Sequence, residues 1–294
     1  MLYRSAQEWH EAREKRLLFF GMSGLGKTHL SSLLRDAGSW FHYSIDYRIG
    51  TRYMGEHIAD NFKVEAMKNP FLAELLRTDS IYVASNITFS NLAPLSAYLG
   101  KPGDPSKGGL PFEEYMRRQE QHRMGEIAAL LDTAHFTERA RTLYGYLNFV
   151  CDTGGSICEV VDPDDPADPV LTALSRSTLM VWIKGSMAHT DELCHRFAKA
   201  PKPMYYSPDF LRKAWAEYLV EKNVDEDRVD PDDFIRRIYR LAMEHRQPIY
   251  AAMASKWGVT VSADRVAAVK TPDDVSAMIA GALDGGVRHS ASAL

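Results

Sequence analysis

The chain has 294 residues, of which 45% are hydrophobic and 25% are charged, and its formal net charge is −4. This composition is typical of a globular protein with enough apolar residues to bury a sizeable core. The slight excess of acidic residues excludes a global basic field, so the sequence predicts no nucleic acid as a partner.

The amino-terminal half alternates short apolar runs with stretches of helical spacing. In chain order, it predicts a strand at 17–20, a helix at 29–35, a strand at 40–45, helical structure from 55 to 77 and a helix from 112 to 131. Periodicity leaves residues 80–89 open between a strand and an extended segment. The glycines and prolines of residues 101–109 predict a loop.

The carboxy-terminal half continues this alternation. It predicts strands at 147–150, 177–183 and 258–262, helices at 189–200, 208–222, 231–245 and 247–256, and a closing helix at 272–283. Residues 162–169 form an acidic stretch whose prolines exclude regular strand pairing, so we expect an exposed loop there. Strands that alternate with helices are typical of a parallel sheet covered by helices on both faces.

Features of the sequence also bear on where the protein works. The chain contains no apolar run near the roughly 18 residues that a membrane helix needs, so no membrane is expected as a partner. Its first 16 residues are charged and have helical spacing, unlike a secretory leader. Three cysteines without such a leader favour a reducing compartment, and we therefore expect a cytoplasmic protein.

The segment Gly21-Met-Ser-Gly24-Leu-Gly26-Lys27-Thr28 fits the Walker A pattern without a mismatch. Glycines at these positions let backbone N–H groups turn inward around a phosphate group. Lys27 can reach the β- and γ-phosphate oxygens, and the Thr28 hydroxyl can bind Mg²⁺. The residues expected to bind ATP are therefore Gly21, Gly24, Gly26, Lys27, Thr28 and the adjacent His29, and the expected cofactors are ATP and Mg²⁺.

Several further segments follow the Walker A segment. They are Tyr43-Ser-Ile-Asp46, Met116-Arg117-Arg-Gln-Glu120, Asp152-Thr-Gly-Gly-Ser156, His195-Arg196, Lys202-Pro-Met204 and His245-Arg246-Gln-Pro-Ile-Tyr250. In this order the set resembles shikimate kinase and related small-molecule kinases of the nucleoside-monophosphate-kinase-like group, within the P-loop NTPase superfamily. Those kinases carry Asp-x-Asp, Phe-Arg-x-x-Glu, Ala-Thr-Gly-Gly-Gly and Arg-x-Pro-Leu-Tyr.

The resemblance implies roles for residues on the substrate side. Asp46 would be the catalytic residue that accepts or orients the proton of the acceptor hydroxyl. Gly154 and Gly155 would let the substrate lie against the backbone. Arg117 and Arg246 would form a guanidinium clamp on an anionic or polyhydroxylated substrate.

The same resemblance implies a mobile lid over the nucleotide. Arg196 would bind the nucleotide, and Lys202 would act as a catalytic residue that offsets charge on the transferred phosphoryl group. Asp152 lies where a Walker B aspartate would lie and could hold Mg²⁺ together with Thr28. The kinases that the chain resembles usually have alanine at that position.

Other readings of these residues stay open. Asp46 could cap the following helix, Arg117 could belong to a solvated helix face, and Arg246 could be an ordinary cation at a helix carboxyl end. The chain also departs from the pattern, because Ser44 replaces the first aspartate and Ser156 the third glycine.

The predicted fold is a three-layer α/β/α P-loop fold around a five-stranded parallel sheet. The chain is longer than a compact shikimate kinase, so we expect one domain over residues 1–284 with helical insertions on the substrate and lid sides, near 60–110, 125–145 and 206–235. Residues 285–294 are small and polar and are expected to be a disordered tail.

The predicted activity is ATP- and Mg²⁺-dependent phosphoryl transfer to a hydroxyl group of a small anionic or polyhydroxylated metabolite. One alternative is a P-loop ATPase that works as a conformational switch or binds a partner protein. Another is a kinase that acts on a nucleic acid or a protein. The sequence indicates neither the acceptor nor the oligomeric state.

Overall fold

A computed structural model describes residues 1–285 of the chain. These residues divide into two compact units, which are described separately below. The sheet unit comprises residues 1–43, 130–193 and those from 245 onward, and the helical unit comprises residues 44–129 and 194–244. One domain over 1–284 stays a prediction, and the expected tail lies, apart from Gly285, outside the described residues.

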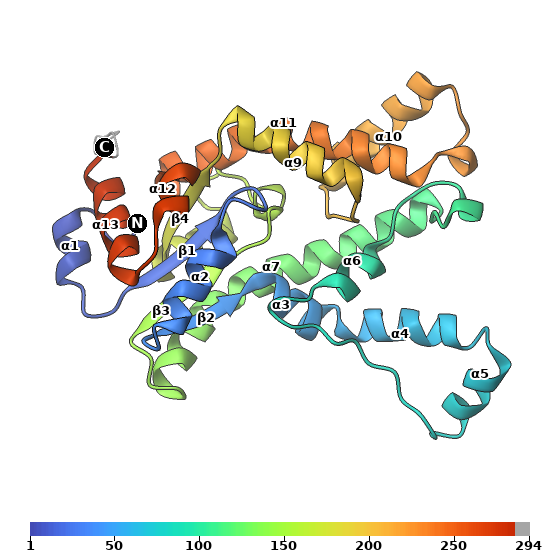
Figure 1. The fold of residues 1–294 in the computed structure, drawn as a ribbon, viewed down its shortest axis with the longest axis horizontal. Coiled ribbons are helices and arrows are strands. Elements are labelled where there is room, and N and C mark those ends of the chain that lie inside the picture. The colour runs from blue at the N-terminus through green and yellow to red at the C-terminus, as the bar shows by residue number, and fades with distance from the viewer. Residues whose placement is uncertain (286–294) are drawn as a thin grey trace. The chain divides into compact units, whose positions relative to one another are not determined.

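The sheet unit is built on a five-stranded parallel sheet (Figure 1). Its strands are β1 (Arg16–Phe20), β2 (Trp40–Ser44), β3 (Asn148–Asp152), β4 (Leu179–Lys184) and β5 (Gly258–Ser262). They lie in the order β2-β3-β1-β4-β5. The central strand β1 is apolar and buried from Leu17 to Phe20, as expected where helices cover a parallel sheet. The predicted α/β fold with a five-stranded parallel sheet is confirmed.

Helices flank this sheet. They include α1 (Ala6–Glu11), α2 (Lys27–Asp36), α8 (Pro169–Ser177), α12 (Ala263–Ala268) and α13 (Pro272–Gly285). Local chemistry determines where several of them begin: the Asp168 carboxylate, for example, accepts a hydrogen bond from the Leu171 N–H and Pro169 occupies the first turn. The acidic stretch before α8 is thus a loop that ends in a helix cap.

The long helix α7 (Phe112–Thr142) extends well beyond the predicted end at 131. Aromatic packing in the sheet unit explains the extension, because the Phe136 ring stacks on Tyr43 at 4.6 Å and on Phe41 at 6.5 Å between ring centroids. Residues 125–142 therefore continue the helix that begins at Phe112, and the insertion expected near 125–145 stays a prediction. Tertiary burial of this kind is not visible in a local sequence window.

The structure also shows the form of two stretches around Pro248 and residues 80–89. The helix α11 (Pro231–Trp257) continues through Pro248, so the stretches expected to be helical at 231–245 and 247–256 form one helix. Buried side chains on both sides of the proline, among them Ala242 and Tyr250, hold the helix together despite the missing N–H. Residues 80–89 contain no regular strand, and only an isolated bridge joins Thr88 to Asn91.

The helical unit consists of short helices and parts of longer ones. Its elements are α3 (Ile45–Arg48), a π-helical turn (Ile49–Tyr53), α4 (Gly55–Ala66), α5 (Pro70–Arg77), α6 (Ala93–Leu99), α10 (Pro208–Lys222) and segments of α7, α9 (Met187–Lys199) and α11. Its apolar core includes Phe112, Trp215 and Phe234. The Trp215 ring stacks on Phe112 at 4.5 Å and meets Phe234 edge-on at 4.9 Å. Within residues 1–285, none of the helices combines the length and the apolarity needed to span a bilayer.

Candidate active site

The Walker A segment forms a tight loop between β1 and α2 in the sheet unit. Gly21 and Gly26 have φ angles of 128° and 101°, in the region that side chains rarely adopt. A Cβ atom at Gly21 would lie 2.8 Å from the Ile183 carbonyl oxygen, and one at Gly26 would lie 2.7 Å from the Val266 side chain. Both positions therefore require glycine for conformation and for space.

Lys27 begins α2, and its buried side chain folds back over the loop. Its Nζ atom donates to the carbonyl oxygens of Gly21 at 2.7 Å and Met22 at 2.8 Å. The ammonium group thus lies beside the amino end of α2, whose first turn carries no acidic residue. Unpaired N–H groups and the positive end of the helix dipole favour an anion there, which fits the phosphate groups of ATP.

The Thr28 hydroxyl group contacts a carboxylate from the neighbouring strand. Its Oγ1 donates to Asp152 Oδ2 at 3.0 Å. Asp152 ends β3 and pairs in register with Phe19 of β1, so the strand order places this carboxylate next to the loop. A carboxylate that accepts the proton of this hydroxyl leaves the hydroxyl lone pairs directed outward, as a Mg²⁺ ligand requires.

A histidine contacts the other oxygen of the Asp152 carboxylate. His42, on β2, lies with its Nε2 at 2.9 Å from Asp152 Oδ1, and the side chains of His42 and Asp152 are only 2% and 8% exposed. Because an ionised carboxylate only accepts hydrogen bonds, Nε2 carries the proton and donates it. The sequence did not single out His42, since a polar residue within an apolar strand does not show which partner it faces.

The donor set of Thr28 and Asp152 fits Mg²⁺. Both residues offer oxygen ligands, and Mg²⁺ is commonly held by one or two protein oxygens together with substrate phosphates and water. Among residues 1–285, no group of three or more His, Cys, Asp or Glu side chains is arranged to hold a metal ion. Thr28 and Asp152 would hold such an ion together with phosphate oxygens and water.

The loop after β3 packs directly against the Walker A segment. A Cβ atom at Gly155 would lie 3.2 Å from Ser23 Oγ, which is a tight contact. The Tyr250 hydroxyl donates to the Gly155 carbonyl oxygen, and burial holds the pKa of Tyr250 well above its ordinary value, so the hydroxyl keeps its proton. Gly155 thus has a packing role between two loops, and Gly154 is buried beside it.

Arg246 lies in the interior of α11 and is buried. Its guanidinium group donates to Glu159 Oε1 at 2.5 Å, and the two side chains are 1% and 0% exposed. The reading of Arg246 as a cation at a helix carboxyl end is wrong, because α11 runs on to Trp257. Its charge is met by a carboxylate of the chain itself.

Arg117 lies on the surface of α7 in the helical unit. Its guanidinium group binds Glu114 in a bidentate pair at 2.7 Å, and the hydrogen bond from Arg117 is the main reason that the pKa of the Glu114 carboxyl falls to about 2. The side chain of Arg117 is 54% exposed, which fits the solvated-face reading. Arg117 and Arg246 are each paired with a carboxylate of the chain, so neither guanidinium group needs a bound anion to balance its charge.

The remaining predicted residues lie in exposed or partly exposed positions. Asp46 belongs to the first turn of α3 in the helical unit, whereas Ser44 occupies the N-cap position, so the reading of Asp46 as the cap is wrong. Arg196 is exposed on α9 and Lys202 lies in the exposed coil after that helix. In the sheet unit, His29 is exposed in the first turn of α2.

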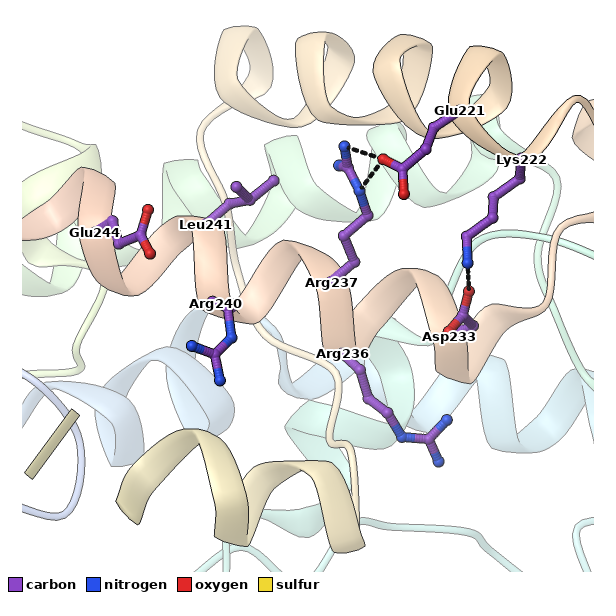
Figure 2. Close-up of a pocket in the computed structure, with 8 residues that line it drawn as sticks. All are labelled: Glu221, Lys222, Asp233, Arg236, Arg237, Arg240, Leu241 and Glu244. Carbon is purple, nitrogen blue, oxygen red and sulfur yellow. Dashed lines mark hydrogen bonds and ion pairs between the residues drawn. The ribbon is translucent and has the colours of Figure 1, made fainter. Parts of the chain in front are cut away.

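A separate cavity of about 320 Å³ opens in the helical unit. It is lined by Glu221, Lys222, Asp233, Arg236, Arg237, Arg240, Leu241 and Glu244, none of which the sequence singled out. Figure 2 shows Arg237 turned toward Glu221, while Arg236 and Arg240 point to the opposite side of α11. The guanidinium groups therefore diverge. Arg237 pairs with Glu221 at 2.7 Å and Lys222 with Asp233 at 3.1 Å, as on a solvated charged face.

Comparisons with known proteins add little to this geometry. The chain matches no protein-family model and none of the curated proteins. Among solved structures, it is similar to shikimate kinase from Bacteroides thetaiotaomicron, with 14% sequence identity over 90% of this chain and 94% of that chain, and with a TM-score of 0.38. A likeness of this size establishes neither a family nor a substrate for the chain.

Proposed function

We propose that this chain is a P-loop phosphotransferase that uses ATP and Mg²⁺ to phosphorylate a hydroxyl group of a small molecule. The observation that supports this most is the hydrogen bond from the Thr28 hydroxyl to the Asp152 carboxylate. Thr28 directly follows Lys27, whose ammonium group donates to the carbonyl oxygen of Gly21 in the glycine loop. A hydroxyl and a carboxylate in this relation are the pair that P-loop enzymes use for Mg²⁺.

In this proposal, each residue of the loop has a physical task. The backbone N–H groups after Gly21 bind the phosphate groups, and Lys27 neutralises charge on the β- and γ-phosphate oxygens. Asp152 keeps the Thr28 hydroxyl oriented with its lone pairs outward. When bound, Mg²⁺ supplies charge neutralisation and a fixed orientation of the phosphate chain.

Asp46 is the proposed base of the reaction. The acceptor oxygen attacks the γ-phosphorus atom, the bond from that phosphorus to the β,γ-bridging oxygen breaks, and the hydroxyl proton passes to the Asp46 carboxylate. Arg196 and Lys202 are proposed to offset the charge on the transferred group. We propose an acceptor molecule that carries hydroxyl groups. We do not propose that it is anionic, since Arg117 and Arg246 are each paired with a carboxylate of the chain.

Nucleotide binding tests the core of this proposal. ATP with Mg²⁺ at about a hundred times its Kd should add about 2.7 kcal/mol to the free energy of unfolding of the wild-type protein, measured by thermal or denaturant unfolding. Lys27→Ala should lose most of this gain because it removes the cation over the phosphates. Lys256→Ala, which removes an exposed lysine of α11 paired with Asp164, is the matched control and should keep it. A folded wild-type protein that ATP does not stabilise would contradict the proposal.

A search for the acceptor separates this activity from its alternatives. Hydroxylated metabolites are screened by thermal shift in the presence of a non-hydrolysable ATP analogue, and each hit is then tested for a phosphorylated product with ATP. ATP hydrolysis without any phosphorylated small molecule would favour the ATPase switch. Transfer of labelled phosphate to RNA or to a protein would favour a kinase that acts on macromolecules.

A further inference from the structure

We propose that His42 is a positioning residue for the metal side of the site: it holds the Asp152 carboxylate in the orientation that serves Thr28. This inference rests on the proposed function, because it assigns a task within the same Mg²⁺ site. His42 contacts Asp152, and Asp152 in turn contacts Thr28, so His42 would act on Thr28 through Asp152.

The three side chains come from three different elements. His42 lies on β2, Asp152 at the end of β3 and Thr28 in the first turn of α2. The two oxygens of the carboxylate are divided between the other two residues: Oδ1 accepts from His42 at 2.9 Å and Oδ2 accepts from Thr28 at 3.0 Å. Because each oxygen is held by a different donor, the carboxylate keeps one rotation about its last side-chain bond. Without such contacts this torsion angle has a broad distribution.

Because Asp152 is buried, the orientation of its carboxylate depends on the contact with His42. The Asp152 side chain is 8% exposed, so water can replace the contact with His42 only in part. Without a donor at Oδ1, the carboxylate gains by turning toward any other donor, and Oδ2 then no longer holds the Thr28 proton. The Thr28 hydroxyl would be free to point its proton toward the metal position, where it repels a cation.

The alternative is a purely structural role, in which His42 only provides a hydrogen-bond donor to the buried Asp152 carboxylate. That reading predicts lower stability for variants of His42 and no specific change in metal dependence. The positioning role predicts a change in the Mg²⁺ requirement of nucleotide binding. Loss of outer-shell partners of metal ligands typically costs about 10–100-fold in metal affinity.

Two amide variants at this position separate the readings. The side-chain nitrogen of His42→Gln can take the place of Nε2 and donate to Oδ1, whereas the nitrogen of His42→Asn corresponds to Nδ1 and does not reach Asp152. Tyr43→Leu is the control, because it disturbs the packing of the same strand against Phe136 without removing a donor to the carboxylate.

The experiment measures ADP binding by calorimetry at increasing Mg²⁺ concentrations, and again in EDTA. We expect His42→Asn to raise the Mg²⁺ concentration at half-maximal effect by about 10–100-fold, with ADP affinity in EDTA unchanged. His42→Gln and Tyr43→Leu should keep the wild-type Mg²⁺ requirement. Melting curves confirm that each variant is folded, and if His42→Asn does not fold, His42→Leu takes its place with the same expectation.

Three results would overturn the role of His42. They are a wild-type Mg²⁺ requirement in His42→Asn, an equal rise in His42→Gln and His42→Asn, or a rise of the same size in Tyr43→Leu. Failure of the proposed function looks different, because the wild-type protein itself would then bind no ADP, with or without Mg²⁺.

Discussion

Replacing Asp46 by asparagine should lower turnover by about 10²–10⁴-fold while nucleotide affinity persists. The substitution keeps the shape of the side chain and removes its capacity to accept a proton. Asp46 follows β2 in the chain and lies in the first turn of α3, with Ser44 at the N-cap position. Because the cap position belongs to another residue, a loss of activity in Asp46→Asn would not be explained by a lost helix cap.

The measurement is the rate of product formation with the acceptor found by the screen, together with the Kd for the ATP analogue. Asp60→Asn provides a matched control, since Asp60 is an exposed carboxylate of α4 paired with Lys63, and its replacement should leave both quantities unchanged. Full transfer activity in Asp46→Asn would exclude Asp46 as the base. A parallel loss of analogue binding would point instead to a general defect in the fold.

Replacing Arg246 by methionine should lower the free energy of unfolding by about 3–5 kcal/mol, because the variant leaves the buried Glu159 carboxylate without its cation. The two side chains are 1% and 0% exposed and 2.5 Å apart, so little water can reach the remaining charge. Methionine retains much of the length of the arginine side chain, which limits the contribution of a cavity. Denaturant unfolding of the wild type and the variant measures the difference.

The double variant Arg246→Met with Glu159→Leu is the decisive control. Replacing both partners of a buried pair by apolar residues is often neutral or even stabilising, so the double variant should recover most of the lost stability. This outcome would establish Arg246 as a structural residue. If Arg246→Met instead kept wild-type stability and raised the KM of the acceptor, Arg246 would be assigned to substrate binding.

The sequence alone was sufficient for the sheet and for the position of the tight glycine loop after β1. The strands β1 to β5 were predicted within a few residues, because short apolar runs bounded by polar or glycine residues are a local signal of buried parallel strands. The Walker A segment was equally clear, since its glycines are required by local backbone angles such as the φ of 128° at Gly21. Both signals are contained in neighbouring residues.

The extent of the helices depended on contacts far along the chain. The helix α7 continues to Thr142 because Phe136 stacks on Tyr43, and α11 passes through Pro248 with buried residues on either side. Propensity favours an earlier end in both places. Burial of large side chains outweighs such local preferences, and it depends on residues that a sequence window does not include.

The roles of individual polar residues were decided only by the tertiary structure. A histidine within a strand and an arginine near a proline have many potential partners. The fold selects Asp152 for His42 and Glu159 for Arg246 because strand order and helix packing bring those pairs together and exclude water from them. The sequence therefore determined that a glycine loop with the Walker A pattern follows β1. The tertiary structure decided which buried groups support it, since the energy of a buried charge depends on its nearest partner and on its distance from solvent.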